Sequence, residues 1–190
     1  MTSPPLHPQV YPVEEDTLLL LETALAEVRP GDRVLEVGTG SGHIAASLLG
    51  RVAGVVAIDI NPHAATTARS RGLEVIRTDL VAGVRGLFDL VLFNPPYLPT
   101  APAERLDDWL EYALDGGPNG RDTIVRFLEE LDGVLAPDGR ALLLVSSLTG
   151  VDEVRALADG EGFAVSVSGE STTEGERLLV LLLVRKGRDD

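Results

Sequence analysis

Hydrophobic and polar positions along the chain follow two alternating periods, and this pattern predicts an α/β domain. Apolar runs of strand length occupy 33–37, 54–61, 73–80, 88–93, 141–147, 163–169 and 177–185. Segments with helical spacing occupy 14–28, 43–51, 62–71, 122–135 and 151–160. Because strand and helix alternate through most of the chain, we expect a seven-stranded, Rossmann-like, doubly wound sheet that is mostly parallel.

The two ends of the chain depart from this alternation. The last two strands are separated only by the polar stretch "GESTTEGE" (169–176), so we expect them to form an antiparallel hairpin at one edge of the sheet. Residues 1–12 contain four prolines and no periodicity, and we expect them to be a flexible arm. Residues 13–190 should then form a single domain. The sequence does not indicate a role for the insertion at 98–121.

Composition narrows the class of protein. The 190 residues suffice for one domain with a sizeable core, and the absence of cysteine excludes disulfides and thiolate chemistry. The three histidines show no metal-ligand spacing, so no metal site is expected. Neither a signal peptide nor an apolar run of membrane-spanning length is present, which makes the cytoplasm the expected location.

Charge adds two expectations. A net charge of -14 opposes tight binding to a nucleic-acid backbone, because that affinity comes mainly from Lys and Arg. Lys186 is the one lysine in this acidic chain, a composition that suggests adaptation to high salt. For such a halophilic protein, the melting temperature should rise between low and molar salt.

A glycine loop follows the first predicted strand. In "EVGTGSG" (36–42), the residues Gly38, Gly40 and Gly42 allow the backbone to turn tightly and to approach a ligand. This is the position at which doubly wound sheets bind their ligands. Glu36 precedes the glycines, where it would repel an anionic pyrophosphate.

Two further carboxylates are expected at the same edge of the sheet. Asp59 ends the second strand and suits ribose hydroxyls, and Asp79 ends the third strand, where it could meet an adenine amino group. Ile60 and Leu80, which follow these acids, are included among the expected cofactor-binding residues. Together with Glu36, this set favours a nucleoside cofactor without phosphate, and S-adenosylmethionine fits that description. A set of plain strand-end caps remains the alternative.

The fourth predicted strand ends in "NPPY", the residues Asn94, Pro95, Pro96 and Tyr97. The side-chain oxygen of Asn94 and the carbonyl of Pro95 can both accept hydrogen bonds from one planar NH₂ group. Such bonds would aim a weakly nucleophilic nitrogen at a methyl group and stabilise the positive charge that develops on it. Tyr97 can form a wall of the site. These four residues are therefore the candidate catalytic residues, with Asn94 also facing the cofactor.

The sequence resembles a known family at several points. The stretches in question are "VYPVEEDTLLLLETAL", "EVGTGSG", "AIDIN", "TDL" and "FNPPYLP", in this order. They are similar to the HemK-type class I S-adenosylmethionine-dependent methyltransferases, and the first is similar to the opening of the short archaeal and eukaryotic branch. The resemblance implies that Thr17 contacts the cofactor. It also implies N5-methylation of the glutamine in the Gly-Gly-Gln motif of class I peptide chain release factors. The departure is Pro12, which directly follows Tyr11 and leaves Val13 at the usual proline position.

The same branch implies a partner, a small zinc-binding activator protein of methyltransferases. In the strand order of this fold, the segment 73–79 lies at a sheet edge, where Val75 and Ile76 would be open to pairing with another strand. We therefore expect a heterodimer formed through this edge.

Other functions fit the sequence less well. An adenine-N6 DNA or RNA methyltransferase would use the same "NPPY" box, but the acidic charge disfavours it. A dinucleotide-dependent oxidoreductase is disfavoured by Glu36. Lysine methylation lacks an identifiable lysine channel, and a catalytically silent binding subunit is disfavoured by the intact box.

Overall fold

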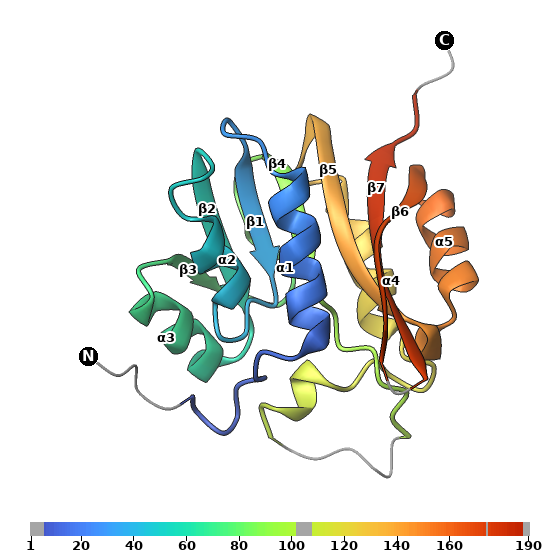
Figure 1. The fold of residues 1–190 in the computed structure, drawn as a ribbon, viewed down its shortest axis with the longest axis horizontal. Helices are drawn as coiled ribbons and strands as arrows, with labels where there is room; N and C mark the ends of the chain where they lie inside the picture. The colour runs from blue at the N-terminus through green and yellow to red at the C-terminus, as the bar shows by residue number, and fades with distance from the viewer. Residues whose placement is uncertain (1–5, 102–107, 174, 188–190) are drawn as a thin grey trace.

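In the computed structural model, which describes residues 6–101, 108–173 and 175–187, the chain forms a mixed sheet covered by helices on both faces (Figure 1). The strands are β1 Arg33–Val37, β2 Gly54–Asp59, β3 Glu74–Arg77, β4 Phe88–Phe93, β5 Leu135–Ser146, β6 Phe163–Thr173 and β7 Glu176–Arg185. The α-helices are α1 Glu15–Glu27, α2 His43–Leu48, α3 Pro62–Ser70, α4 Asp122–Leu131 and α5 Val151–Gly160. The short 3₁₀ helices are η1 Glu111–Ala113 and η2 Ser147–Thr149.

The strand order is β3-β2-β1-β4-β5-β7-β6. The first five of these strands run parallel, and β7 is antiparallel to both β5 and β6. The expected fold class is thereby confirmed. Because β1 and β4 are neighbours in the middle of the sheet, the loops after them lie side by side.

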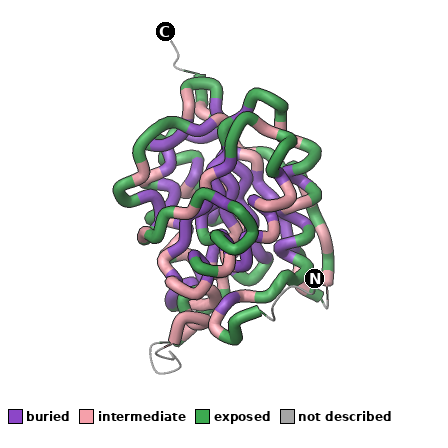
Figure 2. Tube along the Cα trace, turned by 90° about the vertical axis from the view of Figure 1, so that its left-hand side faces the viewer, coloured by how far each residue is buried: buried purple, intermediate pink, exposed green. Residues whose placement is uncertain are grey.

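Two hydrophobic layers hold the helices to the sheet, and the buried residues run through the middle of the molecule (Figure 2). On one face, apolar residues of α1, α2 and α3 pack against the sheet, as Leu20 and Leu48 do. On the other face, α4 and α5 contribute Phe127 and Ala158 among others. The central strand β4 is buried on both faces, which explains its nearly continuous apolar sequence.

Three segments differ from the sequence-based expectation. The helix predicted to reach 135 ends at Leu131, and β5 begins at Leu135 rather than at 141. Residues 136–139 form an irregularity in the β4–β5 pairing, which accommodates a proline without a ladder hydrogen bond. The predicted turn 169–176 is mostly strand, since Thr173 still pairs with Glu176. Its polar residues suit an edge strand that is exposed along most of its length.

The described half of the expected flexible arm, 6–12, is packed against the domain. Val10 is buried, and the Nδ2 of Asn61 donates to the carbonyl of Gln9 (2.7 Å). The ring of His7 stacks on that of His63, with 3.9 Å between their centroids. Part of this segment therefore contacts the domain, residues 1–5 lie outside the described part, and the flexible arm stays a prediction. Within the described ranges, no helix is long and apolar enough to cross a bilayer.

Candidate functional site

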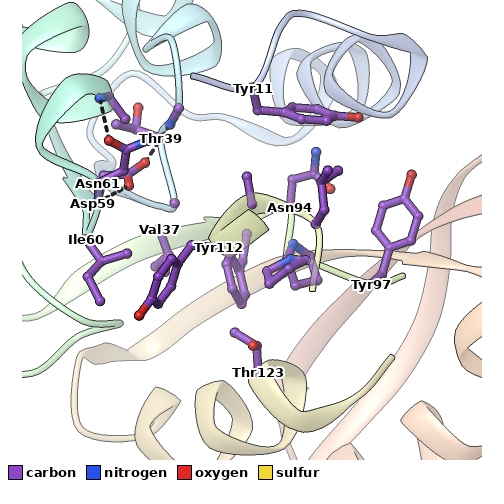
Figure 3. A pocket seen from close by; sticks show the side chains of 18 of the residues that line it. Tyr11, Val37, Thr39, Asp59, Ile60, Asn61, Asn94, Tyr97, Tyr112 and Thr123 are labelled. Atoms are coloured by element: carbon purple, nitrogen blue, oxygen red, sulfur yellow. Dashed lines mark hydrogen bonds between the residues drawn. The ribbon is translucent and has the colours of Figure 1, made fainter. Parts of the chain in front are cut away.

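A cavity of about 610 Å³ opens at the carboxyl ends of β1, β2 and β4. Its volume is in the range of small-molecule and cofactor sites. Figure 3 shows Asp59, Ile60 and Asn61 at one end of the cavity and Asn94 and Tyr97 at the other. The sequence-predicted residues that line it are Thr17, Glu36, Gly38, Gly40, Asp59, Ile60, Asp79, Leu80, Asn94, Pro95, Pro96 and Tyr97.

Gly42 is the predicted cofactor residue that does not line the cavity. It precedes α2 with φ 74°, and a Cβ there would lie 2.9 Å from Leu73 and 3.0 Å from Ala68. Its smallness therefore allows the glycine loop to pack closely against α3. Sequence spacing alone placed it beside Gly38 and Gly40, but it serves packing instead of lining the cavity.

Glu36 is buried beside the glycine loop and forms a hydrogen bond with it. Its Oε2 accepts hydrogen bonds from the hydroxyl of Thr39 and from the backbone N–H of Ala45 (3.1 Å). Burial raises the pKa of Glu36 to about 7, against the opposing effect of these two hydrogen bonds. The side chain thus joins the end of β1, the glycine loop and the first turn of α2.

This shifted pKa predicts a pH dependence of stability. Because the folded protein holds a proton on Glu36 that the unfolded chain releases above its usual pKa of 4.5, the stabilisation is complete below pH 4.5. It is lost as the pH rises to about 7, with an expected loss on the order of 2–3 kcal/mol in the free energy of unfolding. Urea denaturation at pH 5, 6, 7 and 8 measures this loss in the free energy of unfolding.

Glu36→Gln is the matched variant, since its side-chain oxygen accepts the same hydrogen bonds without titrating. The difference in stability between this variant and the wild type should grow from pH 5 to pH 7. A difference that stays constant over this range would contradict the role of Glu36.

Asp59 connects the glycine loop with the start of α3. Its Oδ2 accepts from the N–H of Gly40 (2.8 Å), and its Oδ1 accepts from the N–H of Asn61 (2.8 Å). Burial raises the pKa of Asp59, and the backbone hydrogen bonds oppose that shift. Asn61 in turn caps α3 by accepting from the N–H of His63 (2.9 Å), as its position before Pro62 predicts. A carboxylate held from two sides therefore faces the cavity at this end.

The third acid of the predicted set is placed differently. Asp79 lies two residues beyond the end of β3, and its carboxylate accepts from Arg126 of α4 at 2.7 Å. Both side chains are 49% exposed. Its sequence-predicted contact with adenine therefore competes with a surface ion pair. Leu80, by contrast, is buried with a left-handed backbone (φ 44°), which is rare for a leucine and marks local strain beside the cavity.

The corner formed by Asn94–Tyr97, here called the acceptor corner, contains an unsatisfied acceptor. The Oδ1 of Asn94 is inaccessible to solvent and has no hydrogen-bond partner among the described residues. Buried acceptors without partners are rare in folded proteins, and each costs about 1–3 kcal/mol. The fold therefore retains an acceptor at the cavity that only an added donor can satisfy.

The glycine-rich segment 116–120 and the residues beside it contact the acceptor corner and the residue that follows it. The N–H of Leu98 donates to Leu114, and the N–H of Gly116 donates back to Leu98, each at 3.0 Å. Gly120 has φ 74°, and a Cβ there would lie 2.4 Å from the carbonyl oxygen of Tyr97. The corner is thus held by a backbone contact that only glycine permits.

Sequence reasoning missed a buried acid at the same end of the cavity. Asp16 lies in the first turn of α1, is 3% exposed, and accepts from the hydroxyls of Tyr11 (3.1 Å) and Tyr97 (3.4 Å). Burial, and next the charge of Asp16, raise the pKa of both phenols above the usual value, so they remain protonated donors. A signal was available, because Asp16 shares a helical face with the core residues Leu19 and Leu20.

Residues 108–121, the described part of the insertion beyond its gap at 102–107, form another wall of the cavity. The rings of Trp109 and Tyr112 pack in a tilted arrangement with 5.3 Å between their centroids, and the guanidinium of Arg77 lies 5.7 Å from the centroid of the Trp109 ring. Among the residues that the structure describes, no group of His, Cys, Asp or Glu could hold a metal ion.

Comparisons with known proteins bear on the family of this chain. The family described as Methyltransferase small domain matches residues 11–105. A protein of Methanocaldococcus jannaschii named as an N5-glutamine methyltransferase is 39% identical over 93% of this chain and 92% of its own length. Methyltransferase HEMK2 of Homo sapiens is 35% identical, over 90% of this chain and 88% of its own.

Among solved structures, the E. cuniculi Mtq2-Trm112 complex, responsible for methylation of the eRF1 translation termination factor, contains a similar chain. It has a TM-score of 0.78 and 30% identity, covering 94% of this chain and 99% of that one. The magnesium protoporphyrin IX methyltransferase of Synechocystis with bound SAM, at 18% identity and a TM-score of 0.64, shares the fold over 90% of this chain and 78% of its own. This chain therefore belongs to the methyltransferase small domain family, in its HemK-type branch, and is an S-adenosylmethionine-dependent methyltransferase.

Proposed function

We propose that this chain methylates the N5 nitrogen of the glutamine in the Gly-Gly-Gln motif of an archaeal-type class I peptide chain release factor, in the cytoplasm. The observation that carries the proposal is the buried Oδ1 of Asn94, which has no partner among the described residues. A glutamine side chain offers a planar NH₂ group with two donors, which matches this oxygen and the carbonyl of Pro95. The names of the relatives support the same substrate class.

In this proposal, the acceptor corner performs the positioning. Asn94 and Pro95 accept the two N–H bonds of the substrate amide, hold its nitrogen in line, and stabilise the positive charge that develops there. S-adenosylmethionine, when bound, supplies the electrophilic methyl group. Tyr11 and Tyr97 donate hydrogen bonds to Asp16 and stay protonated, so neither phenol serves as the base, and the proton of the methylated nitrogen leaves to solvent.

The residues at the other end of the cavity fit the cofactor. The glycine loop, 38–42, has no basic side chain and lies against two buried carboxylates, Glu36 and Asp59, which disfavours a pyrophosphate. We assign Asp59 to the ribose hydroxyls and Ile60 and Leu80 to the adenine. Thr17, together with Glu36, is assigned to the amino-acid end of the cofactor.

A methyl-transfer assay tests the proposal. The chain, with and without a small zinc-binding activator protein, is incubated with methyl-labelled S-adenosylmethionine and either a release factor or tRNA and DNA. We expect label in the release factor, abolished by Gln→Ala in its Gly-Gly-Gln loop. Label in nucleic acid alone would overturn the proposal and favour the adenine-N6 alternative, which the acceptor corner also suits. A tRNA1(Val) (adenine(37)-N6)-methyltransferase of a Flavobacteriaceae bacterium is 28% identical over 92% of this chain.

The exposed edge of the sheet supports the proposed heterodimer with a small zinc-binding activator. Strand β3 pairs with β2 on one side, and within the described ranges no strand pairs with its other side (Figure 1). All four of its residues are exposed or half-buried, and Ile76 is 38% exposed. An unpaired edge of this kind can accept a strand from a partner. The similar solved chain is in a complex with Trm112.

Ile76→Asp should weaken this association, because a charge at the edge opposes burial under a partner. We expect the dissociation constant for the activator, measured by isothermal titration calorimetry, to rise at least tenfold, about 1.4 kcal/mol. Leu25→Asp on α1 is the matched control, since Leu25 is equally exposed at 38%. An Ile76 variant that binds as tightly as the Leu25 variant would place the partner elsewhere.

A further inference from the structure

Asp16 is the buried acid that contacts the acceptor corner, whereas the buried acids Glu36 and Asp59 form hydrogen bonds with the glycine loop. Besides the hydroxyls of Tyr11 and Tyr97, Asp16 accepts from the backbone N–H of Thr17 (2.5 Å) and from the hydroxyl of Thr17 (3.1 Å). All four donors are neutral. Each of these groups has a hydrogen to donate, so both oxygens of Asp16 serve as acceptors here.

No cation compensates the charge of this carboxylate within the described residues. Asp16 forms no ion pair there, whereas Asp32, a comparably buried acid, pairs with Arg140 at 2.8 Å. An uncompensated charge in a water-poor site acts strongly on any charged group that enters beside it. The cavity at this end therefore favours a ligand that brings a positive charge.

The position of Asp16 relative to the acceptor corner indicates which positive charge of the ligand lies beside it. Asp16 contacts Tyr97, which belongs to the corner, and both residues line the same cavity as Asn94. Figure 3 places Tyr11, Asn94 and Tyr97 toward the same end. A methyl group delivered to a nitrogen at Asn94 must come from this end. The sulfonium of S-adenosylmethionine carries a positive charge, and the sulfur of the product S-adenosylhomocysteine carries none.

We propose that Asp16 is a specificity-determining residue, whose buried carboxylate makes the cavity prefer the sulfonium cofactor to its neutral-sulfur product. Transfer of the methyl group then removes the attraction, which favours exchange of product for fresh cofactor. The inference rests on the cofactor of the family and is independent of the molecule that accepts the methyl group. It can therefore fail or hold separately from the proposed substrate.

Isothermal titration calorimetry on Asp16→Asn tests the inference without any methyl acceptor. The asparagine keeps the shape, its oxygen still accepts from Thr17, and its NH₂ can donate to the two phenol oxygens. We expect the dissociation constant for S-adenosylmethionine to rise about tenfold, and that for S-adenosylhomocysteine to change by less than about threefold. Sinefungin, which carries an ammonium in place of the sulfonium, should follow S-adenosylmethionine.

Two controls separate charge from structure. Glu22→Gln, on an exposed position of the same helix, removes one negative charge and should leave both dissociation constants unchanged. Tyr97→Phe removes one hydrogen bond to Asp16 and keeps its charge, so the ratio of the two constants should remain that of the wild type.

Equal loss of affinity for both ligands in Asp16→Asn would overturn the inference, because a contact with the amino-acid end of the cofactor, or a purely structural role, acts on both alike. An unchanged ratio with unchanged affinities would overturn it as well. Asp16→Ser provides a second neutral variant should the asparagine variant fail to fold, and the same change in ratio is expected from it. Thermal melts verify that each variant is folded.

Discussion

Asn94→Ala is expected to lower the turnover number for release-factor methylation by about 10²–10³, while the dissociation constant for S-adenosylmethionine changes little. In our proposal, the Oδ1 of Asn94, which has no partner in the described residues, forms its hydrogen bond with the substrate. Removing an unpaired buried acceptor should also leave the free energy of unfolding unchanged or raise it. Single-turnover kinetics, calorimetry and urea denaturation measure the three quantities.

The combination of lost activity and preserved stability is the diagnostic result. Asn119→Ala is a suitable control, because its exposed side chain accepts only from the backbone N–H of Arg121 (3.0 Å) within the described residues. That control should retain turnover within about threefold. An Asn94 variant with wild-type turnover would exclude the assigned role, and an unfolded variant would show that the oxygen has a structural partner.

Asp59→Ala should act mainly on the cofactor, raising the dissociation constant for S-adenosylmethionine about 10²-fold. The carboxylate accepts from Gly40 and Asn61, so its loss releases the glycine loop and the start of α3 as well as removing the proposed ribose contact. Charge-assisted hydrogen bonds of this kind contribute about 1.5–3 kcal/mol each. At saturating cofactor, the turnover number should fall less than tenfold.

Asp79→Ala is expected to weaken cofactor binding much less than Asp59→Ala does. Asp79 is half exposed and paired with Arg126, and exposed ion pairs contribute little. The dissociation constant should rise by no more than about threefold. Equal losses in the Asp59 and Asp79 variants would mean that Asp79 leaves its ion pair and contacts the cofactor, as the sequence alone suggested.

The parallel part of the fold was predictable because its signals are local. Strands β1, β2 and β4 are short apolar runs between clear helix signals, and their observed bounds agree with the predicted ones within two residues. The start of β5 was not predictable, because "APDG" (136–139) is typical of a turn and is tolerated here only as an irregularity opposite β4. Residues 169–173 were missed for a related reason, since an exposed edge strand has no apolar pattern.

The candidate site was likewise predictable only in part. Most predicted residues line one cavity, because most of them lie at or just after the end of a parallel strand, and such ends meet at one edge of the sheet. The burial of Asp16 was readable from its helical face, but its hydrogen bonds with Tyr11 and Tyr97 depend on the tertiary structure. The bond between Asp16 and Tyr97 joins positions 81 residues apart.

By itself, the sequence determined the fold class, and it predicted the edge of the sheet at which the site lies and the kind of nitrogen that the acceptor corner would hold. These properties follow from hydrophobic period, strand order and the donor and acceptor chemistry of "NPPY". Only the tertiary structure decided which carboxylates face the cavity, because burial and partners depend on distant segments. Asp79 is half exposed and paired with Arg126, Gly42 serves packing, and Asp16 is buried without an ion pair among the described residues.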